Sequence, residues 1–285
     1  MRKTLVSGIM AAALWLAPQA GRAQSKPLAY GSQTANPAIR FAYPDTAQDA
    51  YLRRLRRENG LQQLTARAPQ RRDQALLVSQ WVHGLWRHSG RNEPSAPDAL
   101  TIIREAKAGK NFRCVEYAKV TTDALLALGF KARVLALKTR DAETRRAGAG
   151  HVLTEVWLPE HRKWALLDAQ FDLMPTLHQV PLSAVELQAA WVQNQPVSFI
   201  QAGGAAAPGR QRAYRRFVQR YLHFYEVAFD QRPTPAPGGP LQLAGKSGLM
   251  LVPAGSKPPA VFQRRFPLDY LLTTSSVADF YPTPE

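Results

Sequence analysis

The feature that most constrains this sequence is the stretch 113–168, where a pattern typical of a buried helix precedes patterns typical of strands. Apolar side chains recur at helical spacing through 113–128, and Gly129 provides a helix stop. The segments that follow are rich in Val, Leu and Trp, as strands are. Together these segments predict an antiparallel hairpin after the helix. The predicted strands are 131–137, 151–157 and 163–168.

The N-terminus has the pattern of a secretory signal peptide. Arg2 and Lys3 precede an apolar stretch over 5–16, and Gly21 and Ala23 are small residues at the positions that a signal peptidase inspects. We expect cleavage after Ala23 and a periplasmic or secreted protein. An uncleaved membrane anchor is the alternative, although the apolar stretch is short for a span of about 20 residues. No later segment is apolar enough to predict a membrane span.

Cys114 is the one cysteine of the chain, and it lies in the first turn of the predicted helix. Exported proteins usually have cysteines in pairs, as disulfides. At a helix start, unpaired N–H groups and the positive end of the helix dipole stabilise a thiolate and can bind an oxyanion. A buried cysteine that only packs is the alternative, but such a residue gains nothing from this position. We therefore predict that Cys114 is a nucleophile.

A histidine and an aspartate fall on the two strands of the predicted hairpin. If the turn is centred between Pro159 and Glu160, the numbers of cross-strand partners add up to 319, and His151 would lie opposite Asp168. A carboxylate could then orient the imidazole of a general base. Taken singly, the histidine could be a surface residue and the aspartate a solvated or capping one. Together with Cys114 they predict a Cys–His–Asp catalytic triad.

Several segments resemble the core of transglutaminase-like domains. That superfamily places Cys, His and Asp in this chain order, on a helix start and two adjacent strands. The resemblance implies a papain-like α+β fold, with an antiparallel sheet packed on helices. The resemblance covers about 70–175 and includes a preceding helix with an aromatic pair like Trp81 and Trp86. The chain departs from many members at Ala169, where they have a proline after the aspartate. The segments are GKNFRCVEYA (109–118), ALGFKARV (127–134), HVLTEVW (151–157) and WALLD (164–168).

The resemblance implies an exported cysteine-dependent hydrolase or acyltransferase that acts on peptide or carboxamide bonds through a thioester. Cys114 would attack the carbonyl, His151 would transfer protons and Asp168 would orient the imidazole. The sequence does not decide whether water or an amine resolves the thioester. Gln170 and Trp157 are further candidates for substrate contact; packing or a turn hydrogen bond is the alternative for Gln170. The superfamily also has inactive members, so the alternative function is a binding protein whose basic surface holds an envelope polymer or protein.

The charge of the chain is strongly positive. Lys and Arg number 37 against 21 Asp and Glu, a net +16, and removal of 1–23 leaves 34 − 21 = +13. Such a field attracts anionic polymers or membrane surfaces, but the arginine pairs are scattered and no nucleic-acid-binding motif accompanies them. We expect a monomer with a protein or peptide substrate in the cell envelope and no nucleic-acid partner. Because no histidines and cysteines cluster at metal-ligand spacing, neither a metal nor another cofactor is expected.

The chain divides into four predicted parts. These are a signal peptide (1–23), an N-terminal extension with a helix (24–69), the transglutaminase-like catalytic core (70–200), and a C-terminal helix and strand extension packed on the core (201–285). Further helices are predicted over 46–59, 70–88, 98–107, 181–193 and 213–229. We expect the many aromatic side chains of the last helix to be core contacts.

Overall fold

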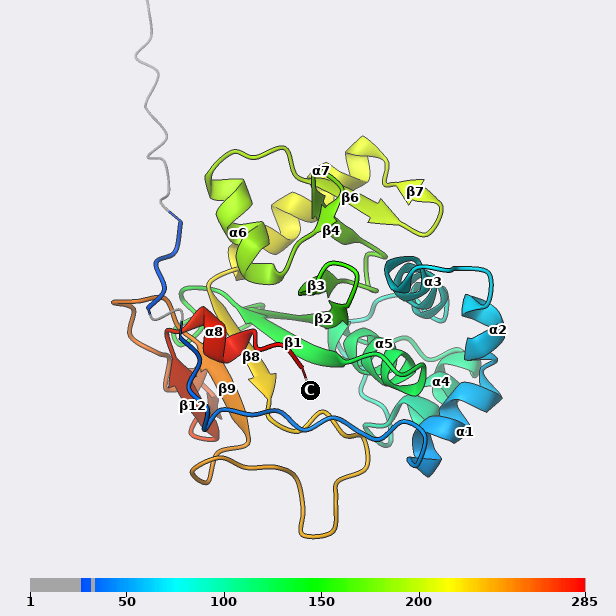
Figure 1. Cartoon of the computed structure of the whole chain (residues 1–285). Coiled ribbons are helices and arrows are strands. Elements are labelled where there is room, and N and C mark those ends of the chain that lie inside the picture. Colours follow the sequence, from blue (N-terminus) through cyan, green and yellow to red (C-terminus); the bar gives the residue numbers. More distant parts are fainter. Residues whose placement is uncertain (1–26, 32–33, 285) are drawn as a thin grey trace, which may run out of the picture.

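The computed structural model describes residues 27–31 and 34–284, so the predicted signal peptide lies outside the described residues (Figure 1). The described chain alternates helices and strands. Up to residue 167 it contains α1 (Ala50–Glu58), α2 (Leu61–Thr65), α3 (Arg71–His83), α4 (Ala99–Lys107), α5 (Cys114–Ala127), β1 (Ala132–Lys138), β2 (Gly150–Leu158) and β3 (Lys163–Leu167).

The second half of the chain adds shorter elements. They are β4 (Met174–Leu177), β5 (Val180–Pro181), α6 (Ala184–Val192), β6 (Ser198–Gln201), β7 (Gly204–Ala205), α7 (Pro208–Val218), the 3-10 turn η1 (Gln219–Tyr221), β8 (Phe224–Ala228), β9 (Gly248–Leu251), β10 (Val261–Phe262), β11 (Phe266–Pro267), β12 (Leu271–Thr274) and α8 (Val277–Phe280). Within the described ranges, none of the helices has the length and apolarity needed to span a bilayer.

A six-stranded sheet in the order β12-β9-β8-β1-β2-β3 forms the centre of the molecule. Its neighbouring strands are antiparallel, except that β12 runs parallel to β9. Helices α1 to α5 lie together at one side of this sheet, and α6 and α7 lie with the small sheet β5-β4-β6-β7 at another (Figure 1). The α+β fold predicted from the sequence, with an antiparallel sheet packed on helices, is confirmed.

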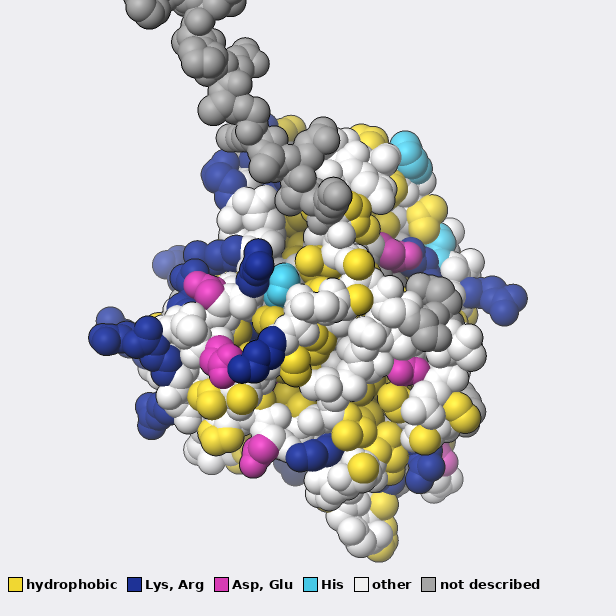
Figure 2. All heavy atoms as spheres, turned by 90° about the vertical axis from the view of Figure 1, so that its left-hand side faces the viewer, with side chains coloured by type: hydrophobic (Ala, Val, Ile, Leu, Met, Phe, Trp, Pro, Cys, Tyr) yellow, Lys and Arg dark blue, Asp and Glu magenta, His cyan; other side chains and the backbone are white. Residues whose placement is uncertain are grey.

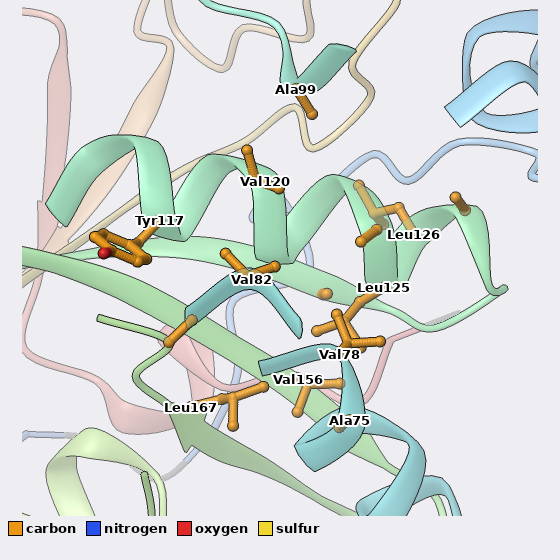
Figure 3. Packing of buried hydrophobic residues seen from close by; sticks show 14 of the residues in the cluster. Ala75, Val78, Val82, Ala99, Tyr117, Val120, Leu125, Leu126, Val156 and Leu167 are labelled. Carbon is orange, nitrogen blue, oxygen red and sulfur yellow. The ribbon is translucent and has the colours of Figure 1, made fainter. Parts of the chain in front are cut away.

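Two apolar cores lie on opposite faces of the large sheet, because successive strand residues point to opposite sides. On one face, Val156 of β2 and Leu167 of β3 pack against α3 and α5, where Val82, Val120 and Leu125 are buried (Figure 3). Side chains of the other parity pack against α6, α7 and α8. The residues of the candidate active site lie at one end of the sheet, where α5 begins and β2 begins.

The helix predicted over 213–229 is wrong in its second half. Helix α7 ends at Val218, and the segment Phe224–Ala228 forms β8 between β1 and β9. Two strand partners satisfy the backbone of a segment rich in Phe, Tyr and Val, residue types that favour strands. The predicted core role of the aromatic side chains is confirmed for Tyr214, Tyr221 and Tyr225, which are buried.

The earlier helices form where they are predicted but are shorter. Asp49 caps α1 by accepting the N–H of Leu52, so this helix begins after the predicted start. Helix α3 ends at His83, before Gly84. Asp98 caps α4, because its side chain accepts the backbone N–H of Thr101 at 2.9 Å, so this helix begins one residue after the predicted start.

The C-terminal part of the chain completes the large sheet. Strand β8 pairs with β1, and β9 and β12 extend the sheet beyond β8. The segment after β12 also contacts the sheet, since Arg133 of β1 donates to the Phe280 carbonyl (2.7 Å) and the indole N–H of Trp164 donates to the Pro282 carbonyl (2.9 Å). Arg133 and Glu155 form a fully buried ion pair at 2.7 Å next to this contact.

Candidate active site

Cys114 is the first residue of α5, and its side chain is partly exposed. The local sequence fixes the helix start, because Glu116 accepts the N–H of Arg113 (3.0 Å) and pairs with its guanidinium (2.8 Å). The first N–H groups of a helix have no intrahelical acceptor and carry the positive end of its dipole. The thiol therefore lies where a thiolate or an oxyanion is stabilised.

His151 and Asp168 are hydrogen-bonded through Nε2 and Oδ2 at 2.7 Å, and their side chains are only 2% and 1% exposed. The predicted hairpin register is wrong: Thr154 pairs with Leu167, so partners add up to 321 and the turn is centred one residue later. This change moves the opposite strand by two residues. Because side chains alternate with a period of two, both groups stay on the same face and meet as diagonal neighbours.

The environment of His151 favours its protonated form. Burial by itself lowers the pKa of His151, but the charges and hydrogen bonds of Asp168 and Cys114 outweigh it and raise the pKa to about 10. The contribution of Cys114 shows that the thiol lies beside the ring. Since Nε2 is bonded to the carboxylate, Nδ1 is the nitrogen that remains for the thiol. At neutral pH the buried imidazole of His151 is therefore protonated.

Asp168 is held in place by its own chain. It follows β3, and its backbone exchanges hydrogen bonds with Leu173 at 2.9 and 3.1 Å across a tight turn. The N–H of Gln170 donates to Oδ1 at 3.1 Å, which leaves Oδ2 for the imidazole. The hydroxyl of Tyr214 lies nearby, where burial and the charge of Asp168 raise the pKa of Tyr214 well above its ordinary value. The carboxylate is thus oriented by the backbone of the turn that follows β3.

Three aromatic rings surround His151, and the sequence did not identify them as part of the site. Phe217 and Phe171 approach the imidazole edge-on, with ring centres 5.1 and 6.1 Å away, and Tyr221 lies at 5.9 Å. Phe217 and Tyr221 come from α7 and η1, far from the histidine in sequence. Their spacing of four places them on one helix face, but that pattern does not reveal which residue they contact. They exclude water from the base.

An open pocket of about 710 Å³ lies beside the triad, between the end of α3 and the turn after β3. Its wall includes Trp86, Tyr117, Gln170, Phe171 and His88. Among the described residues, Trp86 Nε1 and Gln170 Oε1 are buried and have no hydrogen-bond partner. Burial and then the positive charge of His151 lower the pKa of His88, so this histidine is neutral at pH 7. None of the triad residues lines this pocket, but Phe171 of its wall lies against His151 and Gln170 follows Asp168 by two residues.

The two residues predicted to contact substrate have different positions. Gln170 lines the pocket beside the triad, and its backbone also makes the turn hydrogen bond to Asp168. The structure does not bring Trp157 to the site. It lies six residues along β2 from His151, which is roughly 20 Å at the rise of a strand, and its ring packs on Trp164 at 5.9 Å. Trp157 and His151 lie on the same face of β2, but the length of the strand separates them. Their shared face therefore does not bring Trp157 to the site.

No other described feature offers comparable chemistry. A second open pocket of about 590 Å³ lies between α3 and the β6–β7 hairpin, and its wall includes none of the aromatic rings that contact His151. Within residues 27–31 and 34–284, no group of three or more His, Cys, Asp and Glu side chains is placed to hold a metal ion. The thiol site is therefore the candidate active site.

Comparison with known proteins relates this site to a family. Residues 59–169 match the family model described as the transglutaminase-like superfamily. That segment runs from the end of α1 through Cys114, His151 and Asp168. A search of curated proteins finds no significant match.

Solved structures with a similar fold include proteases and transglutaminases. A candidate cysteine protease from Cytophaga hutchinsonii is 12% identical, covers 59% of this chain and 57% of its own, and has a TM-score of 0.34. A candidate protease from Parabacteroides distasonis is 15% identical, with coverages of 58% and 31% and a TM-score of 0.31. A transglutaminase from red sea bream is 13% identical, with coverages of 65% and 46% and a TM-score of 0.32. This chain thus spans between 31% and 57% of the length of these structures.

Proposed function

We propose that this chain, whose residues 59–169 match the transglutaminase-like family model, is a cysteine-dependent hydrolase or acyltransferase that acts on peptide or carboxamide bonds. One observation carries the proposal: a buried imidazole is bonded to the Asp168 carboxylate at 2.7 Å and lies beside the thiol of Cys114 at a helix start. A cysteine that only packs needs neither partner. The arrangement is the one that nucleophile, base and orienting group require.

The reaction would proceed in two steps. In the first, Sγ of Cys114 bonds to the carbonyl carbon, the carbon–nitrogen bond breaks, and the His151 imidazolium gives its proton to the departing amine. The product is a thioester on the enzyme. In the second, the now neutral imidazole takes a proton from water or from an amine, which attacks the thioester and releases the thiolate. Asp168 keeps the ring oriented and stabilises its charged form throughout.

The oxyanion that forms during attack needs donors that point at it. The backbone N–H of Cys114, at the start of α5, is one donor. We assign the indole N–H of Trp86 as the second, because it is buried without a hydrogen-bond partner among the described residues. Its ring centre lies 4.4 Å from that of Tyr117, which is one turn after the nucleophile on α5. A buried donor without a partner costs stability, so a ligand that accepts from it explains its presence.

The cell envelope is the proposed place of action. The basic start, the apolar stretch over 5–16 and the small residues before the cleavage point at Ala23 support export. We propose a monomer that acts on a protein or peptide in that compartment. Hydrolysis and amine transfer both remain within the proposed chemistry, because the acceptor enters only in the second step.

The proposal is tested by mass spectrometry of the intact protein after incubation with 4-nitrophenyl acetate, a small acyl donor. We expect an acetyl group on Cys114 of the natural chain and none on the Cys114→Ala variant. His151→Ala should acquire the adduct far more slowly. A primary amine is then added to the acylated enzyme. Acetate as the product indicates hydrolysis, and the acetylated amine indicates acyl transfer. A natively folded chain that never acquires the adduct would contradict the proposal and favour a binding protein without catalysis.

A further inference from the structure

A group of exposed arginines surrounds the side of the site where His151 lies. It is formed by the β1–β2 loop, the end of η1 and the β10–β11 hairpin. On the face shown in Figure 2, lysine and arginine side chains gather on the left-hand side, so the positive charge is unevenly spread over that face. We call this group the arginine cluster: Arg140, Arg145, Arg146, Arg220, Arg264 and Arg265.

Arg220 connects the arginine cluster to the catalytic imidazole. It donates to the Tyr221 hydroxyl at 2.6 Å, and its guanidinium lies 4.7 Å from the centre of that ring. The same ring is 5.9 Å from the ring of His151. Phe217 makes a second connection of the same kind, 5.6 Å from the guanidinium and 5.1 Å from the imidazole. The guanidinium is therefore within about 11 Å of the catalytic ring.

The β10–β11 hairpin is fastened to the β1–β2 loop. The backbone N–H of Gln263 donates to the Ala142 carbonyl (2.8 Å), and the backbone N–H of Arg264 donates to the Glu143 carbonyl (3.2 Å). Phe262 packs so closely on Gly150, the neighbour of the catalytic histidine, that a Cβ there would lie 3.0 Å from the ring.

The tip of this hairpin has an unfavourable backbone. Gln263 and Arg264 have φ values of 53° and 60°, in the left-handed region where glycine is cheaper. Such local strain is common at functional sites. The side chain of Arg264 donates through Nε to the Thr144 carbonyl at 2.5 Å, which further fastens the hairpin to the β1–β2 loop.

The arginine cluster has more positive charge than its acidic neighbours can neutralise. Asp141 pairs with Arg145 through two hydrogen bonds of 2.9 and 3.1 Å. In the part of the chain that the structure describes, the other five arginines of the cluster form no ion pair with an acidic side chain. The loop and hairpin contain one further acidic residue, Glu143. The guanidiniums that have no acidic partner, held on fastened loops beside the site, suit carboxylates, which they bind in a bidentate manner.

We propose that the acyl-donor substrate is a polypeptide with an acidic segment, which binds the arginine cluster while the scissile amide lies at Cys114. This inference rests on the proposed thiol chemistry, because that chemistry requires the anionic group and the amide to belong to one molecule. The distance from Arg220 to the imidazole corresponds to roughly three residues of extended peptide. The acidic residues therefore begin about three positions from the acyl-donor residue.

The test measures peptide binding by fluorescence anisotropy to the Cys114→Ala protein, so that no turnover occurs. The labelled peptides contain one glutamine as acyl donor and four glutamates, which start either three positions away on one or the other side or much further along. A neutral peptide has serines in place of the glutamates. The cluster variant reverses three charges by Arg140→Glu, Arg146→Glu and Arg265→Glu. The matched control makes the same change in net charge at exposed residues far from the site: Arg40→Glu, Arg57→Glu and Arg162→Glu.

We expect one of the close acidic peptides to bind about tenfold more tightly than the neutral one at about 50 mM salt, and the difference to shrink at about 500 mM. The cluster variant should lose this preference, and the control variant should keep it. Thermal unfolding of both variants verifies that they fold. The salt dependence of peptide binding, measured with the six arginines unchanged, tests the inference without any substitution in the cluster.

Three results would overturn the inference. They are equal binding of acidic and neutral peptides, equal loss of binding in the two variants, and binding of anionic phospholipid vesicles in place of the acidic peptides. Acylation by 4-nitrophenyl acetate is measured separately on the chain with its cysteine. Failure of the thiol chemistry therefore gives a different pattern from failure of the arginine cluster.

Discussion

The buried pair of His151 and Asp168 predicts a specific dependence of stability on pH. Folding raises the pKa of His151 from about 6.5 in the unfolded chain to about 10. The contribution of the charged imidazole is then fully present below pH 6.5 and is lost as the pH rises through about 10. The difference between the two pKa values corresponds to about 5 kcal/mol. This is a ceiling, because buried pairs relax and water reaches them.

The perturbation is Asp168→Asn, which preserves size but removes the charge that opposes the burial of His151. The pKa of the imidazole should then fall, since burial alone lowers it. At pH 6 the variant should be less stable than the natural chain by about 3–5 kcal/mol, the usual cost of breaking a buried pair. This gap should close as the pH approaches 10, because the natural chain loses its advantage when the imidazole deprotonates.

The assay is urea unfolding of both proteins at intervals between pH 6 and pH 10. Groups that titrate equally in both proteins cancel in the difference between their free energies of unfolding. Glu155→Gln is the matched control: it also removes a buried carboxylate, but its partner is Arg133, which stays charged over this range. Its gap to the natural chain should not close. A gap for Asp168→Asn that is constant with pH, or an imidazole that titrates below pH 6.5 by NMR, would refute the reasoning.

Three further predictions concern the second oxyanion donor, the core between α3 and α5, and the C-terminal segment after β12. Trp86→Phe preserves the ring packing but removes the N–H, so the rate of acylation should fall about 100-fold with unchanged thermal unfolding; an unchanged rate would exclude the indole as a donor. Leu125→Ala leaves a cavity in the core between α5 and α3 and should reduce the free energy of unfolding by about 2–5 kcal/mol in urea. A chain that ends at Ser276 lacks the Phe280 carbonyl that accepts from buried Arg133, so it should lose about 3 kcal/mol or more by the same measurement.

The sequence predicts the candidate site better than its surroundings, for a physical reason. Both ends of α5 depend on local features. At its start, Glu116 bonds back to Arg113, and just beyond its end Gly129 has a φ of 75°. Strand alternation survives an error in the register, so His151 and Asp168 stay on one face although their predicted alignment is wrong. The position of the three residues therefore follows from short-range patterns. Their catalytic role remains a prediction.

The aromatic rings and the arginine cluster could not be predicted in the same way. Phe217 and Tyr221 reach His151 only because the chain after α7 turns back and enters the sheet as β8. The segment Phe224–Ala228 has residue types that suit both a buried helix and a strand, and pairing with β1 and β9 decides between them. Contacts so far apart in sequence depend on the whole topology, which periodicity within one segment does not determine.

The central claim, that Cys114 is an activated nucleophile, is tested most directly by its alkylation with iodoacetamide in the native protein. We expect rapid alkylation at pH 6 to 7, where the imidazolium of His151 is present beside the thiol. His151→Ala should slow the reaction about 10-fold or more at pH 6, because it removes that charge. A thiol that is inert in the native protein and reacts only after unfolding would contradict the account.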